Sequence, residues 1–278
     1  MDEKTVGTGS MQEMIQRINA LYHKSQGEGL TAQEKEEQAR LRKAYVANVR
    51  AGLRGQLDQI SIVEKDGSIT NLKDKAIKKN KKAIREKSLA IRDGLSTKEQ
   101  EKNSERIRET LYIQRAYIEA EIVLSYVAYQ SEVHTLPIIR QALADGKKVF
   151  CPKVQGNDME FYLIEDTASL KEGYRGILEP SADSAERALS EILKQYDFAG
   201  RVLMLMPGCA FDKNCGRLGY GKGFYDRYLA KTAKNYSVSF YKIAFAYECQ
   251  IWPEIPQDEQ DVRPDMVITE EAVYQLVN

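Results

Sequence analysis

The sequence predicts an α/β fold with a mostly parallel sheet flanked by helices, preceded by an N-terminal α-helical hairpin. Three observations lead to this prediction. Apolar residues recur at helical spacing near the start of the chain, short apolar runs alternate with helical patterns through the rest, and a glycine-rich loop follows one of these runs. Alternating strands and helices are typical of a parallel sheet that helices cover.

Length and composition indicate a soluble chain of two domains. The chain has 278 residues, about twice the usual size of one domain, and we expect domains at residues 1–72 and 73–278. Lys plus Arg equals Asp plus Glu at 41 each, so the net charge says nothing about a nucleic-acid partner, and only local clusters of charge can. Four cysteines without a C-x-x-C pair argue against a zinc site or disulfides. The chain has no signal-peptide pattern and no apolar run near the roughly 20 residues of a membrane span, so we expect a cytoplasmic location.

Two helices are predicted in residues 1–72. Apolar residues between 14 and 22 have helical spacing, residues 25–29 form a turn, and Thr31 with Glu34 makes a capping box that opens a second helix. A short hairpin or an extended tail is expected around residues 65–67. The second helix carries five cations that could form a basic face: Arg40, Arg42, Lys43, Arg50 and Arg54. A solvated helix surface is the simpler interpretation of this face.

The start of the second domain is strongly basic. Residues 73–87 contain eight cations and two acids, which a solubilising linker would explain. Lys81 and Arg85 are four residues apart, so on a helix they share one face and could grip a triphosphate. Lys82 is the alternative to Lys81 if the helical register shifts by one residue.

Strand and helix signals then alternate. Ser96 and Glu99 form a capping box that opens a helix running to about Tyr117. The predicted strands are residues 122–127, 148–152, 160–164, 202–206, 243–246 and 266–268. The later predicted helices are residues 136–144, 183–196 and 223–234. Ligands gather at the carboxyl ends of parallel strands, so we expect a site at that edge of the sheet.

The loop after residues 202–206 is the main candidate for this site. Its residues 216–223 contain four glycines and two cations, and a carboxylate lies on each side of them: Gly216, Gly219, Gly221, Gly223, Arg217, Lys222, Asp212 and Asp226. Glycines let backbone N–H groups approach an anion, and the N-terminus of the following helix adds its dipole. The spacing matches neither G-x-x-x-x-G-K-S/T nor G-x-G-x-x-G, and a flexible turn is the alternative. We predict phosphate binding, with Arg217 and Lys222 both reachable from solvent.

Two other loops follow predicted strands. Glu132 lies just past the first strand and is either an ordinary surface acid or helix cap, or a ligand-binding carboxylate. Residues 255–265 contain four acids, Asp258, Glu259, Asp261 and Asp265. They form either a solvated loop or a source of carboxylates for the Mg²⁺ of a nucleotide, because Mg²⁺ needs only one or two protein carboxylates beside phosphate oxygens.

Two parts of the chain resemble known protein families. Residues 14–72 resemble a small bacterial family of uncharacterised two-helix proteins, on Ile18-Asn19-x-Leu21 and Gly29-Leu30-Thr31-x-x-Glu34 among other motifs. That family has no agreed biochemical role, so the resemblance implies a helical hairpin and little more.

Residues from about 78 to 278 resemble the 5-formyltetrahydrofolate cyclo-ligase family. The resemblance is carried by Pro207-Gly208-x-Ala210-Phe211-Asp212, by the glycine loop through Asp226, and by Gln130-x-Glu132 and Asp261-x-x-x-Asp265 in the family's order. It implies ATP-dependent cyclisation of 5-formyltetrahydrofolate to 5,10-methenyltetrahydrofolate through a phosphorylated formyl group. It also implies ATP and Mg²⁺ as cofactors, and a folate substrate with or without a polyglutamate tail.

The same resemblance implies roles for individual residues. The implied ATP contacts are Lys81, Arg85, Arg217, Leu218, Gly219, Tyr220, Gly221, Lys222, Gly223 and Tyr225. The implied folate contacts are Val127, Glu132, Tyr220, Gly221, Lys222, Gly223 and Phe224. Arg217 and Lys222 would be catalytic, and Asp226 and Asp261 would be the magnesium ligands. Tyr174 and Arg175 stay open as alternative folate contacts.

Two other functions stay open. One is a nucleotide-dependent phosphotransferase that acts on another amide or hydroxyl. The other is an interaction protein that binds nucleic acid through its basic N-terminal region. Under the cyclo-ligase hypothesis we expect a small-molecule substrate, neither a membrane nor a nucleic-acid partner, and a monomer.

Overall fold

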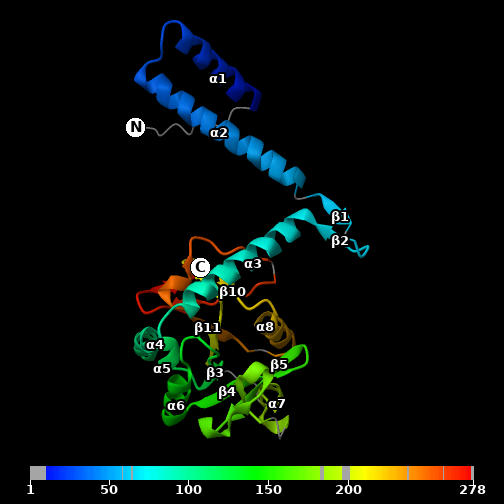
Figure 1. Cartoon of the computed structure of the whole chain (residues 1–278), viewed down its shortest axis with the longest axis vertical. Coiled ribbons are helices and arrows are strands. Elements are labelled where there is room, and N and C mark those ends of the chain that lie inside the picture. Colours follow the sequence, from blue (N-terminus) through cyan, green and yellow to red (C-terminus); the bar gives the residue numbers. More distant parts are fainter. Residues whose placement is uncertain are drawn as a thin grey trace. The chain divides into compact units, whose positions relative to one another are not determined.

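The computed structural model describes residues 11–57, 59–63, 65–181, 185–195, 201–236, 238–258 and 260–276. The chain forms two compact units, Met1–Ala76 and Ile77–Asn278. Figure 1 labels many of their elements. The domain boundary predicted between residues 72 and 73 lies close to this division and stays a prediction.

The first unit contains the predicted helical hairpin. Helices α1 (Met11–Gln26) and α2 (Ala32–Leu57) are joined by a short turn and followed by strands β1 (Ser61–Val63) and β2 (Ile69–Asn71), which pair antiparallel. The capping box is present, because the Thr31 amide donates to Glu34 and the Glu34 amide donates to the Thr31 hydroxyl. Every side chain from residue 46 to residue 57 is exposed. Little apolar surface is therefore buried within this unit.

Three helices lie between β2 and the first strand of the central sheet, and their residues show the helical spacing of apolar side chains. Helix α3 covers Leu72–Asp93 and α4 covers Thr97–Tyr112, with the predicted capping box of Ser96 and Glu99 at its start. The prediction of one helix to Tyr117 was wrong. Gln114 adopts an extended conformation (φ −73°, ψ 132°), and the short α5 (Arg115–Ile118) follows. This break turns Tyr117 into the core, where its hydroxyl donates to Asp145 at 2.7 Å.

A seven-stranded sheet forms the centre of the second unit. Its strand order is β14-β13-β11-β8-β3-β4-β5; the five inner strands run parallel, and the two edge strands pair antiparallel. The strands are β3 (Ile122–Ser125), β4 (Lys148–Gln155), β5 (Asp158–Ile164), β8 (Val202–Met206), β11 (Phe240–Phe245), β13 (Met266–Ile268) and β14 (Val273–Gln275). The predicted α/β class with a mostly parallel sheet is thus confirmed, whereas β14 was not predicted.

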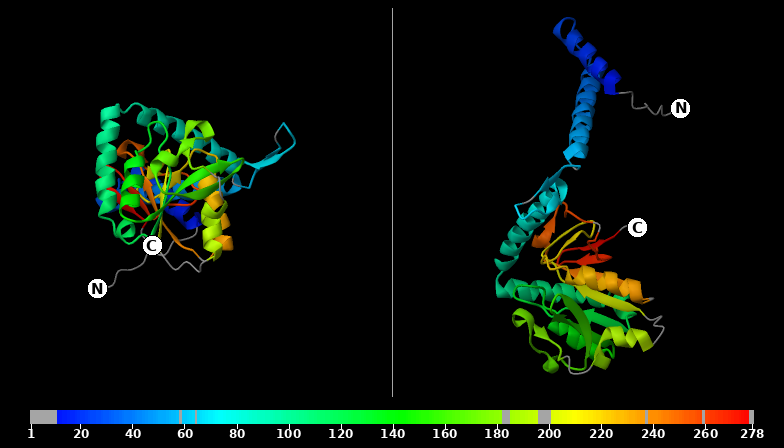
Figure 2. Two further views of the ribbon diagram at one scale, coloured as in Figure 1. Left: turned by 90° about the horizontal axis from the view of Figure 1, so that it is seen from below. Right: turned by 90° about the vertical axis from the view of Figure 1, so that its right-hand side faces the viewer.

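Helices cover both faces of this sheet (Figure 2). The α4, α5 and α6 (Leu136–Ala144) helices pack in one buried cluster with side chains such as Val123 and Leu203. The α7 (Leu189–Gln195) and α8 (Phe224–Asn235) helices pack in a second cluster with Leu124 and Met204. Neighbouring strand residues point to opposite faces, which explains why these strands are apolar throughout. The predicted helix 183–196 lies partly outside the described residues at both ends.

Short strands and 3₁₀ helices lie in the segments that connect the main elements of the second unit. The strands β9 (Ala210–Asp212), β10 (Arg217–Leu218) and β12 (Ile251–Trp252) form a small three-stranded sheet, and β6 (Lys171–Glu172) pairs with β7 (Leu178–Glu179). The described residues also form the short 3₁₀ helices η1 (Thr167–Ser169), η2 (Tyr174–Gly176), η3 (Ala185–Arg187) and η4 (Glu248–Gln250). In the described part of the chain, no helix is long and apolar enough to cross a membrane.

The carboxylate of Asp212 holds the turn between β9 and β10. The side chain is buried and accepts hydrogen bonds from the amides of Gly216 (2.7 Å), Asn214 (2.9 Å) and Ile255 (2.8 Å). The residue that flanks the glycine loop on its N-terminal side is therefore a structural acceptor. It fixes the start of the loop against the chain that follows β12.

Replacing Asp212 with Ala should lower the free energy of unfolding by about 3 kcal/mol, because three backbone donors lose their acceptor. Lys213→Ala is the matched control, since this neighbouring side chain is exposed and a surface substitution changes stability by about 0.5 kcal/mol or less. Urea unfolding of both variants measures the difference. Equal midpoints for Asp212→Ala and the wild type would contradict the structural role.

Candidate active site

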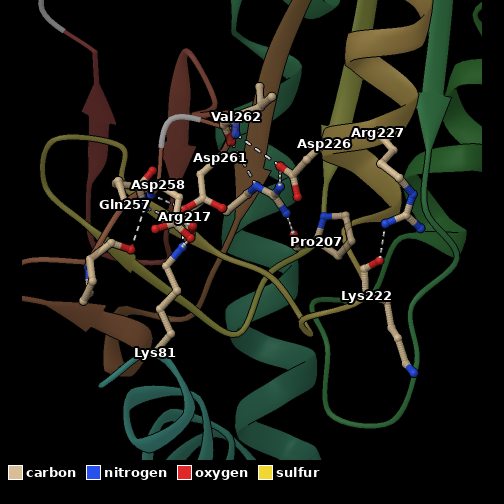
Figure 3. A network of polar contacts seen from close by, with 11 residues as sticks. Lys81, Pro207, Arg217, Lys222, Asp226, Arg227, Gln257, Asp258, Asp261 and Val262 are labelled. Atoms are coloured by element: carbon tan, nitrogen blue, oxygen red, sulfur yellow. Dashed lines mark hydrogen bonds and ion pairs between the residues drawn. The ribbon is translucent and has the colours of Figure 1, made fainter. Parts of the chain in front are cut away.

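The candidate site lies where the sequence predicted it, at the carboxyl ends of β3 and β8. The loop after β8 carries the glycines, and the loop after β3 carries Glu132. The α3 helix supplies Lys81, and Asp258 and Asp261 supply two carboxylates (Figure 3). Four segments that are far apart in the sequence therefore meet at one edge of the sheet.

Lys81 is held by two carboxylates. Its Nζ lies 2.7 Å from Asp258 Oδ2 and also contacts Asp261 Oδ2, and the lysine side chain is only 11% exposed. The Asp258 amide donates to Asp261 at 2.7 Å, which shapes this acidic turn. Lys82 points elsewhere: its side chain is 74% exposed and pairs with Glu86 at 3.8 Å. Of the two alternatives, Lys81 is the one that enters the site.

Asp265, another acid of the same loop, has its described hydrogen bonds outside this cluster. Asp265 accepts from both the backbone amide (2.7 Å) and Nζ (2.8 Å) of Lys242. Glu259 lies outside the described residues. The acidic loop is therefore divided between a structural carboxylate and the pair, Asp258 and Asp261, that faces Lys81.

Arg217 forms the second ion pair of the site. Its Nη2 lies 2.6 Å from Asp226 Oδ1, and its other nitrogens donate to the carbonyls of Pro207 and Val262, each at 3.3 Å. The Val262 amide donates to the same Asp226 oxygen at 3.1 Å. The expectation that solvent reaches Arg217 was wrong, because these partners enclose the guanidinium and leave the side chain 4% exposed.

Lys222, unlike Arg217, is exposed. Its side chain points away from the two ion pairs in Figure 3, and it has no side-chain partner among the described residues. Its backbone carbonyl accepts from Arg227 Nη1 at 2.7 Å. The neighbouring Gly221 and Gly223 have φ of 86° and 65°, a region that favours glycine, so this part of the loop requires glycines.

The α3 helix supports the loop from one side. Arg85 Nε donates to the Gly219 carbonyl at 2.8 Å, and the Ser88 hydroxyl donates to the Cys209 carbonyl at 2.6 Å. A Cβ atom at Gly221 would lie 3.3 Å from the Arg85 guanidinium, so arginine and loop backbone are already in close contact. Leu218, an implied ATP contact, buries its side chain against Ile84. Lys81 and Arg85 thus do share one helix face, as their spacing predicted.

Glu132 is buried and connected to the glycine loop. Its Oε1 accepts from the Tyr220 hydroxyl at 2.5 Å, and its Oε2 accepts from the Tyr129 amide at 2.8 Å. Burial raises the pKa of Glu132, whereas these hydrogen bonds and the charge of Arg92 act to lower it. Arg92 Nη1 donates to the Tyr220 hydroxyl at 2.9 Å. An ordinary surface acid is therefore excluded as the interpretation of Glu132.

The sequence analysis missed Arg92. It is 2% exposed and lies seven residues after Arg85, so the helical spacing that linked Lys81 with Arg85 could have included it. Together with Glu132 it lines a narrow hollow between Tyr126, Pro207 and Gln250.

Aromatic side chains lie beside these polar groups. The rings of Phe224 and Tyr174 meet edge to face with centroids 6.2 Å apart, whereas Arg175 is exposed. The Tyr225 ring contacts Phe161, and its buried hydroxyl has no hydrogen-bond partner among the described groups. Such an orphan hydroxyl is expected to meet a ligand or a water molecule. Val127, an implied folate contact, is buried in the core cluster on the α4 side of the sheet.

The implied magnesium ligands fit an ion that a nucleotide helps to hold. Within the described residues, no three His, Cys, Asp or Glu side chains form a group that could bind a metal alone. The hydrogen bonds described for Asp226 reach Oδ1, and those for Asp261 reach Oδ2, so one oxygen of each carboxylate remains for another partner. Two such oxygens together with phosphate oxygens suit Mg²⁺.

The first unit is similar to proteins without an assigned role. Residues 13–75 match the family described as "Bacterial protein of unknown function (DUF896)". A UPF0291 protein of Lachnospira eligens is 44% identical over 77 residues, which cover 28% of this chain and 92% of that protein. The similarity agrees with the predicted resemblance and adds no biochemical role.

The second unit is similar to characterised enzymes. Residues 77–270 match the model of the 5-formyltetrahydrofolate cyclo-ligase family. The mouse 5-formyltetrahydrofolate cyclo-ligase is 33% identical over 184 residues, which cover 64% of this chain and 87% of the mouse protein. The solved structure of Aquifex aeolicus 5,10-methenyltetrahydrofolate synthetase superimposes with a TM-score of 0.58 at 31% identity, covering 71% of this chain and 93% of that one. With the matching fold and the glycine loop in place, the chain belongs to the 5-formyltetrahydrofolate cyclo-ligase family.

Proposed function

We propose that the second unit catalyses the reaction of its family, the ATP-dependent cyclisation of 5-formyltetrahydrofolate to 5,10-methenyltetrahydrofolate. One observation supports this most directly: Tyr220, a residue of the cationic glycine loop, donates a hydrogen bond to the buried carboxylate of Glu132. The loop suits a triphosphate, and a buried carboxylate suits the N–H groups at the edge of a pterin ring.

The chemistry explains why the reaction consumes ATP. The formamide oxygen of the substrate attacks the γ-phosphorus, and the bond to the bridging oxygen breaks, which releases ADP. The folate N10 then attacks the carbon of the resulting iminium phosphate. The carbon–oxygen bond breaks, phosphate leaves, and N10 loses its proton. No step requires a covalent bond to the protein, so catalysis depends on positioning and on charge stabilisation.

The nucleotide half of the site would use cations from two elements. Arg85 and the backbone N–H groups of residues 219–223 surround the phosphates, and Lys222 reaches over them from its exposed position. Lys81 and Arg217 are paired with carboxylates in the free chain. Contact with phosphate oxygens would therefore require both cations to exchange a carboxylate oxygen for a phosphate oxygen.

Asp226 and Asp261 would hold magnesium, each through the carboxylate oxygen that its described hydrogen bonds leave available. A magnesium ion bound there would neutralise the negative charge that develops on the transferred phosphoryl group and on the departing ADP. In the chain itself, the two acids orient Arg217 and Lys81 until the nucleotide arrives.

The folate half of the site would use Glu132 and the aromatic side chains of Tyr174, Phe224 and Tyr225. Phe224 packs edge to face on Tyr174, so Tyr174 rather than Arg175 is the proposed ring contact. The buried Tyr225 hydroxyl, which lacks a partner among the described groups, would donate to the bound substrate. Val127 would contribute apolar surface below the ring. The cytoplasmic location and the monomeric state stay predictions from the sequence.

The direct test of the reaction is an absorbance assay with purified full-length protein. The methenyl-folate chromophore should form from 5-formyltetrahydrofolate only when ATP and Mg²⁺ are both present. A phosphotransferase that acts on another amide or hydroxyl would cleave ATP with its own substrate and give no such chromophore. Folded protein that forms no chromophore would overturn the proposal.

The contrast between Lys222 and Arg217 provides a second test. Lys222→Ala should lower kcat/KM by about 100-fold, because one cation at the transition state is lost, and should leave the unfolding midpoint unchanged. Arg217→Ala should lose activity and also about 3 kcal/mol of stability, because it leaves Asp226 partly buried without its partner. Wild-type turnover in Lys222→Ala would show that the loop assignment is wrong.

A further inference from the structure

Arg92 is a buried cation whose described hydrogen bonds go to two hydroxyl groups. It is 2% exposed, and its Nη1 and Nε donate to the Tyr220 hydroxyl and to the Ser131 hydroxyl, each at 2.9 Å. Taking a guanidinium out of water is expensive unless charged or polar groups compensate. Burial lowers the pKa of Arg92, whereas Tyr220 and Glu132 act to raise it, and Glu132 is the carboxyl group of the two.

These hydrogen bonds have a fixed direction. A guanidinium can only donate, so the Tyr220 oxygen must accept from Arg92, and the single proton of that hydroxyl is left for Glu132 Oε1 at 2.5 Å. Glu132 must then be an acceptor at Oε1. Its Oε2 is also an acceptor, because the Tyr129 amide donates to it at 2.8 Å.

The second arm of Arg92 acts on the neighbouring residue. The Ser131 hydroxyl accepts from Arg92 Nε and donates to Asp93. Since Ser131 immediately precedes Glu132, this arm fixes the backbone that carries the carboxylate. One side chain on α3 therefore determines both the direction of the Tyr220 hydrogen bond and the position of the loop after β3.

Besides Arg92 and Tyr220, four titratable groups from other parts of the second unit lie near Glu132. Tyr126 follows β3, Cys209 follows β8, Tyr225 lies on α8, and the Tyr247 hydroxyl lies 3.5 Å from the backbone carbonyl of Glu132. All four are neutral at physiological pH, because burial raises the pKa of each. The charge that favours the ionised form of Glu132 comes from Arg92.

We propose that Arg92 is a positioning residue for folate binding: through Tyr220 it keeps Glu132 a hydrogen-bond acceptor for the N–H groups of the substrate. The inference rests on the proposed function, since it assumes that Glu132 faces the pterin. Tyr220 lies between Gly219 and Gly221, so the same hydrogen bonds also join the folate carboxylate to the nucleotide loop.

Three variants of the full chain test the proposal. Arg92→Met removes the charge and both donors at similar length, Arg92→Lys keeps the charge, and Tyr220→Phe breaks the connection while Arg92 stays in place. Each should raise the KM for 5-formyltetrahydrofolate, by roughly 10-fold for Tyr220→Phe, as expected for one lost hydrogen bond to a charged group, with a smaller change in the KM for ATP. Arg92→Lys should retain more affinity than Arg92→Met. Arg108→Lys, on α4 and paired with Glu105, is the control and should change neither constant.

The pH profile separates a positioning role from a merely structural one. Folate binding requires ionised Glu132, so it weakens as pH falls through the pKa of this carboxyl. Losing the charge of Arg92 raises that pKa further, and the pH at which binding weakens should move upward in Arg92→Met. Glu132→Gln should lack this pH dependence. If Arg92→Met does not fold, Tyr220→Phe and Arg92→Lys still decide the outcome through their KM values.

A readout independent of turnover completes the test. Carboxyl-selective NMR of the free protein should show a higher pKa for Glu132 in Arg92→Met and in Tyr220→Phe than in the wild type. An unchanged pKa, or equal increases in the KM values for folate and ATP, would overturn the inference. If the wild type forms no chromophore, the proposed function fails, whereas the NMR comparison still tests whether Arg92 acts on Glu132.

Discussion

The ion pairs between Lys81 and Asp261 and between Arg217 and Asp226 connect the parts of the site. The first joins α3 to the acidic loop, and the second joins β10 to the first turn of α8. Val262 strengthens this arrangement, because its carbonyl accepts from Arg217 and its amide donates to Asp226. These contacts hold Lys81 and Arg217 at the carboxyl edge of the sheet, and the hydrogen bonds of Arg85 and Ser88 hold the backbone of the glycine loop there.

Buried ion pairs are a poor source of stability, because removing both charges from water costs about as much as their attraction returns. The pairs in this chain are better explained by function. In the free protein, cations and carboxylates neutralise each other. A triphosphate together with a divalent cation offers each of them a new partner of opposite charge, so the site can accept four negative charges without leaving any of its own charges buried and unpaired.

Most of the fold follows from local patterns. The runs at residues 202–206 and 266–268 were recognisable as strands because they are apolar and bounded by turn residues. The break before α5 was not recognisable in the sequence, because helical spacing continues through Gln114 and the break depends on burying Tyr117. The β9, β10 and β12 strands were missed for a similar reason: they are two or three residues long and depend on Asp212, whose amide partners include Ile255, far along the chain.

The site residues also fall into those that local sequence patterns predicted and those that depend on distant partners. Spacing along one helix correctly joined Lys81 with Arg85, and the order of strands and loops brought Glu132 to the glycine loop. The burial of Arg217 and the hydrogen-bond partners of Arg92 could not be predicted, because both depend on side chains from distant segments. The role of the N-terminal hairpin is not implied by its sequence patterns or by its fold.

The exchange of charged partners is the central claim about the site, and ATP binding tests it most directly. Isothermal titration calorimetry would measure the affinity for ATP with EDTA and with increasing Mg²⁺, for the wild type and for Asp261→Asn, which removes a carboxylate from Lys81. Wild-type affinity should rise about 10-fold or more with Mg²⁺, whereas Asp261→Asn should bind ATP more tightly than the wild type in EDTA and gain less from Mg²⁺. Equal affinity of the two proteins in EDTA, with the same gain from Mg²⁺, would contradict the account.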